Sequence, residues 1–124
     1  MSDGVGVKSA RLLTAQMLLG PPQATITYPG DWESFWSEGN DGTGDYIDIT
    51  LEALATDPED DDSTLLVEWW SETDGKLGEG TTLSTRIHMT QQCSQNIVIT
   101  LNVTDSDLNM TPDQVTINIH YVCK

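Results

Sequence analysis

Acidic side chains gather at two places in this sequence where they could bind a metal ion. One run follows a predicted strand that ends near residue 56, and two more acids follow a strand that ends near residue 104: Asp57, Glu59, Asp60, Asp61 and Asp62, then Asp105 and Asp107. Carboxylate oxygens supplied by two loops are the hard ligands that Ca²⁺ takes. Asp-Pro and Asp-Ser pairs also form turns without a metal. That alternative does not explain the run of acids, whose charges repel one another unless they are solvated or metal-bound.

The two cysteines, Cys93 and Cys123, are too few for a disulfide scaffold and lack metal-ligand spacing. They stand at the outer ends of the last two predicted strands. Partners in an antiparallel pair have a constant sum of residue numbers, so Val103 opposite Asp113 would place Cys93 opposite Cys123. A shift of two residues would leave the cysteines diagonal and still near bridging range. We predict a disulfide between them, and two buried reduced thiols are the alternative.

Three aromatic residues, Trp32, Phe35 and Trp36, lie in a segment (29–44) that we expect to be a 16-residue loop. They could form a contact surface for carbohydrate or protein, or they could cover one end of the core. We expect Trp36 to be the core plug and keep Trp32, with Phe35, as the surface contact. His88 and His120 stand singly on predicted strands, and no catalytic pair or triad is indicated, so we expect no enzyme activity.

Charge divides the chain into two parts. There are 20 acidic residues against 5 Lys plus Arg, for a formal net charge of −15. Residues 1–22 hold Asp3, Lys8 and Arg11, a net charge of +1, which leaves −16 on residues 23–124. Scattered single cations argue against nucleic-acid binding. No apolar run is long enough for a membrane helix, and the N-terminus does not resemble a secretory signal.

Alternating apolar residues from residue 23 onward indicate strands. The pattern predicts strands at 24–28, 45–56, 65–70, around 83–89, 97–103 and 115–121, with a turn at Asp74-Gly75. Trp69 shares a face with Leu65 and Val67, so it is the predicted core tryptophan, and Trp70 should be more exposed. About seven short strands with regular turn signals favour an all-β antiparallel sandwich over residues 23–124.

Residues 1–22 differ from the rest of the chain and form a predicted N-terminal docking arm. Helix-forming residues from Ser9 to Leu19 are followed by Gly20-Pro21-Pro22, which stops a helix. The arm either frays and packs on the sandwich or docks on another subunit. Its apolar side chains are many for a free tail, and the candidate partner-binding residues are Leu12, Leu13, Met17, Leu18 and Leu19.

Several strings resemble the PKD-like and bacterial immunoglobulin-like domains. They are Ala-Thr-Asp-Pro-Glu-Asp at 55–60, Trp69 followed by Asp-Gly-Lys-Leu-Gly-Glu-Gly at 74–80, and Ile-Thr-Leu-Asn-Val-Thr-Asp-Ser-Asp at 99–107 with Val-Thr-Ile at 115–117. The resemblance covers about residues 24–122 and implies an immunoglobulin-like sandwich. Some members of that family bind Ca²⁺ at these loops, which makes Asp57, Asp60 and Asp105 the implied metal ligands. This sequence departs from the family pattern in its tryptophan-rich first loop and in having a single copy of the domain.

Single domains of this kind are used as decorations on viruses of bacteria and archaea, and such proteins assemble without a signal peptide. We therefore expect a non-enzymatic virion protein on the capsid or tail surface, with the arm docked on the major capsid protein or another virion protein and the acidic sandwich projecting. Self-association is allowed, and nucleic acid and membrane are not expected partners. The alternative is an extracellular carbohydrate- or protein-binding adhesion module from a larger surface protein.

Overall fold

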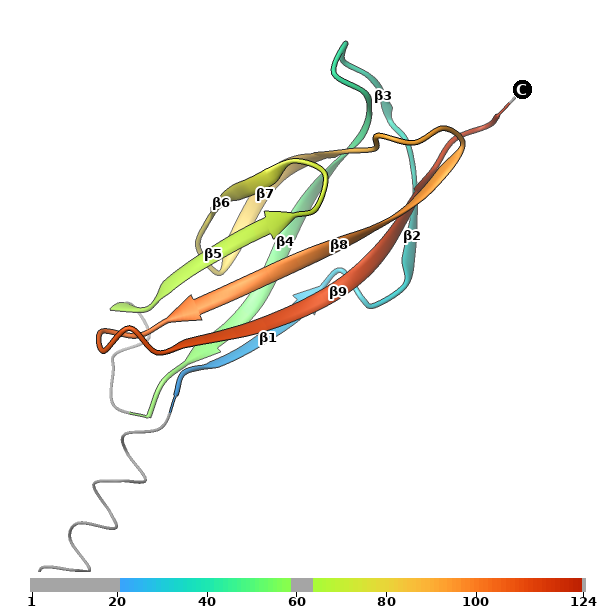
Figure 1. Ribbon diagram of the computed structural model, residues 1–124. Coiled ribbons are helices and arrows are strands. Elements are labelled where there is room, and N and C mark those ends of the chain that lie inside the picture. Colours follow the sequence, from blue (N-terminus) through green and yellow to red (C-terminus); the bar gives the residue numbers. More distant parts are fainter. Residues whose placement is uncertain (1–20, 59–63, 124) are drawn as a thin grey trace, which may run out of the picture.

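The structure, a computed structural model, describes residues 21–58 and 64–123, which form two facing β-sheets (Figure 1). Nine strands are found in this part of the chain: β1 (Gln23–Tyr28), β2 (Glu33–Trp36), β3 (Gly39–Asn40), β4 (Asp45–Thr56), β5 (Leu66–Ser71), β6 (Gly75–Glu79), β7 (Thr82–His88), β8 (Ser94–Thr104) and β9 (Met110–His120). The predicted all-β sandwich is confirmed.

The two sheets differ in how their strands are connected. In the four-stranded sheet, β4 pairs with β1, β3 and β7, all antiparallel. The five-stranded sheet has the order β2-β9-β8-β5-β6, and its β2–β9 pair is parallel. The chain changes sheets between β1 and β2, directly after the cis peptide bond between Tyr28 and Pro29.

The prediction of one loop over residues 29–44 is wrong, because β2 and β3 lie within it. Glu33 pairs with Ile117 and Trp36 pairs with His120, so β2 supplies partners to the backbone groups along the outer edge of β9. Six of the other seven strands correspond to the ranges expected from the alternating pattern, and the seventh, β6, begins at the expected Asp74-Gly75 turn. The two added strands are short and lack a clear apolar alternation, so a period-two pattern could not reveal them.

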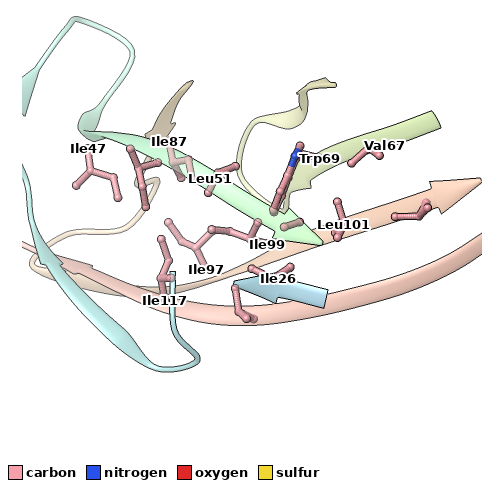
Figure 2. Packing of buried hydrophobic residues seen from close by; sticks show 14 of the residues in the cluster. Ile26, Ile47, Leu51, Val67, Trp69, Ile87, Ile97, Ile99, Leu101 and Ile117 are labelled. Atoms are coloured by element: carbon pink, nitrogen blue, oxygen red, sulfur yellow. The ribbon is translucent and has the colours of Figure 1, made fainter. Parts of the chain in front are cut away.

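Apolar side chains from both sheets fill the space between them (Figure 2). Trp69 is fully buried and its indole N–H donates to the carbonyl of Gly80 at 2.7 Å. The predicted facing is confirmed here, since Trp70 on the opposite side of β5 is 38% exposed. The largest fully buried residues around Trp69 come from both sheets: Ile47, Leu51, Ile87, Ile97, Ile99, Leu101, Val103, Ile117 and Ile119.

The β8–β9 hairpin has a register two residues away from the predicted one. Val103 pairs with Thr111 rather than with Asp113, and Ser94 pairs with His120. The turn is shorter than the sequence suggested, because the N–H of Asp105 already bonds to the carbonyl of Asn109 at 3.0 Å. Asp113 instead faces β1, where its carboxylate accepts a hydrogen bond from the N–H of Ile26 at 2.7 Å.

Candidate functional site

Asp105, one of the candidate Ca²⁺ ligands, holds the turn between β8 and β9. It is only 4% exposed, and its Oδ1 accepts hydrogen bonds from the backbone N–H groups of Asp107 and Asn109, both at 2.9 Å. Its Oδ2 accepts from the side-chain amide of Asn109 at 3.2 Å. Burial raises the pKa of Asp105, but the bonds from Asn109 and Asp107 outweigh it and leave the pKa below its ordinary value.

The structure therefore brings two of the three candidate metal ligands together. Asp57 lies close enough to Asp105 to influence its pKa, whereas Asp60 lies outside the described residues. Within residues 21–58 and 64–123, no group of three or more His, Cys, Asp or Glu side chains is placed to hold a metal ion. Turn formation accounts for Asp105 by itself, and Ca²⁺ binding stays a prediction.

Cys93 and Cys123 are joined by a disulfide at the end of the five-stranded sheet, with a Cα–Cα distance of 5.0 Å. In the observed register Cys93 stands next to Tyr121, whose N–H donates to the carbonyl of Cys93 at 2.9 Å. The two cysteines are thus diagonal rather than directly opposite, and the bond ties the start of β8 to the segment that follows β9.

The tryptophan-rich segment is arranged differently from the prediction. Phe35 points toward the core and meets the Tyr28 ring edge-on at a centroid distance of 6.5 Å. Trp36 is 63% exposed, so its expected role as a core plug is wrong. Neighbouring residues of a strand face opposite sides, so inward-facing Phe35 leaves Trp36 outside. Trp32 is also 63% exposed and has a φ of 65°, a backbone conformation unusual for this residue type.

Trp36 stands at one end of a row of contacting side chains on the outer face of the five-stranded sheet, and hydrogen bonds join the row from His120 onward. Its ring meets the His120 imidazole at a centroid distance of 4.1 Å and an angle of 76°. Because the amide oxygen of Asn118 can only accept, Nδ1 of His120 carries the proton of their 2.7 Å bond. The Asn118 amide donates in turn to Ser94 Oγ at 2.8 Å and to Asn96 Oδ1 at 3.0 Å. Sequence reasoning missed this row, which depends on the register of three strands.

His88 is not isolated in space, because two loops bring acids to its ring. Nε2 lies 2.7 Å from Asp41 Oδ2 and Nδ1 lies 2.8 Å from Asp74 Oδ1. Burial lowers the pKa of His88, but the bonds to the two carboxylates outweigh it and raise the pKa above its ordinary value. We call Asp41, Asp74 and His88 the histidine clasp. Both ring nitrogens are bonded to carboxylates, so the clasp is built to join loops rather than to transfer protons.

The edge of β4 between β1 and β3 borders an open hollow of about 620 Å³. Its lining combines aromatic, hydroxyl and acidic side chains: Thr27, Tyr28, Phe35, Asp48, Ile49, Thr50 and Glu52.

The predicted arm contacts, Leu12, Leu13, Met17, Leu18 and Leu19, lie outside the described residues. In the part of the chain that is described, no helix is long and apolar enough to cross a bilayer.

Comparison with known proteins gives a match in structure alone. No family model and no curated protein matches the chain. The chain is similar to the fibronectin(III)-like modules of Clostridium thermocellum CbhA, with a TM-score of 0.54 and 18% sequence identity over 82% of this chain. The alignment spans 47% of that chain, slightly less than half of its length.

The chain has an immunoglobulin-like fold. The expected resemblance is supported at this level, and the narrower PKD-like assignment stays a prediction. A similarity at this identity concerns the fold and leaves function to be argued from this chain's own surfaces.

Proposed function

We propose that the chain is a non-catalytic attachment module that is held at its N-terminal end and projects its acidic sandwich outward. The observation that supports this proposal is a patch of exposed apolar side chains at that end, formed by Leu66, Leu108 and Met110. Leu66 and Met110 both pair with Thr104, from either side of β8, and are 42% and 56% exposed. Leu108, in the turn beside them, is 83% exposed. We call these three residues the arm-end patch.

The arm-end patch lies where residues 1–22 enter the sandwich. The carbonyl of Pro22 accepts a hydrogen bond from Thr111 Oγ1 at 2.6 Å, and Gln23 pairs with Thr56. Apolar groups exposed together on a strongly acidic protein indicate a contact surface. The predicted arm leucines would extend this surface, so that arm and patch dock together on a virion protein, with the major capsid protein as the proposed partner and the virion surface as the location.

Binding of the purified full-length chain to capsid shells assembled from a major capsid protein tests this proposal. We expect Leu108→Ser with Met110→Ser to weaken binding about tenfold, and deletion of residues 1–22 to abolish it. Val122→Ser is the matched control, because Val122 is 73% exposed in the segment that follows β9, at the opposite end of the sandwich. Failure of the full-length chain to bind shells, or unchanged binding after the deletion, overturns the proposal.

A second candidate function is an extracellular recognition module that binds protein or carbohydrate. It is favoured by Trp32 and Trp36, which stand before and at the end of β2 and are each 63% exposed. The backbone of Trp32 is fixed, since its N–H donates to the carbonyl of Thr116. Glycan-array binding that is lost on Trp32→Ala, and not on Leu54→Ala, would support this candidate; no binding of the wild-type chain to any array or partner would exclude it.

A further inference from the structure

The outer face of β2, β9 and β8 carries no charged side chain, although the chain as a whole has 20 acidic residues. These strands lie wholly within the described residues, and the pairing registers show which residues share that face. We call it the neutral face, and its members are Ser34, Trp36, Ser94, Asn96, Val98, Thr100, Asn102, Thr104, Met110, Pro112, Gln114, Thr116, Asn118 and His120.

Two acids at the borders of the neutral face are bonded to backbone groups, and a third, Glu68 on β5, is paired with Lys76 at 3.0 Å. Asp31 Oδ1 accepts from the N–H of Thr116 at 2.8 Å, and Glu72 Oε1 accepts from the N–H of Val98 at 2.9 Å. The inward-facing acid of β9, Asp113, bonds to β1 on the other side of the sheet. The neutral face thus lacks charge over its breadth, while acids surround it.

Hydrogen-bonding groups on the neutral face are held in fixed positions. Since Nδ1 of His120 donates to Asn118, the other ring nitrogen, Nε2, is the one that can bond to a ligand. Asn96 receives the Asn118 amide on its oxygen and keeps its own amide N–H groups for a ligand. A second pair, Gln114 Nε2 to Thr100 Oγ1 at 3.2 Å, continues the arrangement toward the centre of the sheet.

An aromatic ring next to fixed, uncharged donors and acceptors matches the chemistry of a sugar. The C–H side of a pyranose packs on an indole, and its hydroxyls both donate and accept hydrogen bonds, as amides and imidazole do. A neutral polymer is not repelled by the surrounding carboxylates, whereas an anionic one is. An open sheet face suits an extended chain better than a small molecule, which needs a concave site.

We propose that the neutral face binds a neutral polysaccharide, with Trp36 as the stacking platform and His120, Asn96 and Ser94 as hydrogen-bonding partners. This inference rests on the second candidate function and names its surface and ligand class. Trp32 lies in the loop before β2 and is not part of the neutral face. Substitution of Trp32 or of Trp36 therefore distinguishes binding at the loop from binding at the neutral face.

Depletion assays with insoluble cellulose and chitin, and affinity electrophoresis in soluble mannan, test the proposal. We expect the wild-type chain to bind at least one neutral polymer, and Trp36→Ala to weaken that binding about tenfold. Asn96→Ala should weaken it less. Leu54→Ala, which removes an equally exposed apolar side chain from the other sheet, should leave it unchanged. Polygalacturonate, an anionic polymer, should not bind. Far-UV circular dichroism checks that each variant is folded.

Three outcomes would overturn the proposal in different ways. Binding to none of the neutral polymers excludes this ligand class. Binding that is lost on Trp32→Ala and kept on Trp36→Ala leaves the recognition module standing and removes the neutral face. A wild-type dimer in sedimentation that Trp36→Ala converts to a monomer makes the face a protein interface instead.

Discussion

The neutral face and the outer face of the four-stranded sheet are built from opposite chemistry. On the neutral face, the side chains are linked by hydrogen bonds between amides, hydroxyls and one imidazole. The outer face of the four-stranded sheet is joined by charges: Arg86 donates to both oxygens of Asp48 at 2.7 and 3.0 Å and to Asp41 at 3.3 Å, and its guanidinium lies 3.6 Å from the centre of the Tyr46 ring. The acidity of the chain is therefore sorted between faces rather than spread evenly.

This sorting makes the two faces respond to different conditions. Bonds between amide and hydroxyl groups do not depend on ionisation, and these make up most of the bonds of the neutral face. Ion pairs and the histidine clasp depend on protonation and are screened by salt. Each face has a cross-link near the same end of the sandwich (Figure 1). The disulfide lies beside the neutral face, and the histidine clasp lies at the end of the four-stranded sheet.

The largest expected effect comes from removing the covalent link beside the neutral face. Cys93→Ser with Cys123→Ser should lower the free energy of unfolding by about 3 kcal/mol, because a link across a sequence separation of 30 restricts the unfolded chain. Urea unfolding of the oxidised protein and of the double variant measures it. Equal midpoints, or two free thiols in the purified protein, would contradict the disulfide.

The histidine clasp should give the next largest effect, and a pH-dependent one. The folded pKa of His88 is raised above 6.5, so protonation stabilises the fold; this contribution is complete below pH 6.5 and is lost as the pH rises through the folded pKa. His88→Gln should cost about 1 kcal/mol in the acidic part of this range and less under alkaline conditions. Denaturant unfolding across this range tests it, with His120→Gln as the control. A pH-independent difference would show that His88 acts uncharged.

The ion pairs of Arg86 should give the smallest effect. Arg86→Gln should lower Tm by about 1–2 °C at low salt, because these charges are exposed and solvent screens them. The difference should vanish in concentrated NaCl, and scanning calorimetry at two salt concentrations measures it. A difference that persists at high salt would assign the stabilisation to packing of the arginine on Tyr46 instead.

Much of the fold could be predicted because its strands alternate. The pattern at residues 45–56 and the choice between Trp69 and Trp70 depend only on which neighbours share a side, which a sequence displays directly. The cysteines were placed near each other despite a register error of two residues, since a shift of that size keeps every side chain on its face.

The surfaces could be predicted less well because they depend on pairing between distant segments. Trp36 faces outward only because Phe35 is drawn to the core as β2 joins β9. The histidine clasp needs Asp41, Asp74 and His88 from three separate parts of the chain. Within its own segment each of these residues is an ordinary polar or aromatic residue. Which residues meet, and which side they face, is decided by the register with the partner strand, and that register cannot be read from one segment alone.

The parallel pairing of β2 with β9 has a mechanical consequence. The described chain begins at the end where β1 pairs with the last residues of β4, and the C-terminal segment leaves from the opposite end (Figure 1). Tension between the two termini pulls β2 and β9 in opposite directions along their own axes. The four pairs from Glu33–Ile117 to Trp36–His120 then carry the load together, in shear, and must break at once rather than one after another. Once the pairs between β1 and β4, which the N-terminal pull reaches first, have opened, a domain tethered at one end and pulled at the other would resist extension at this strand pair.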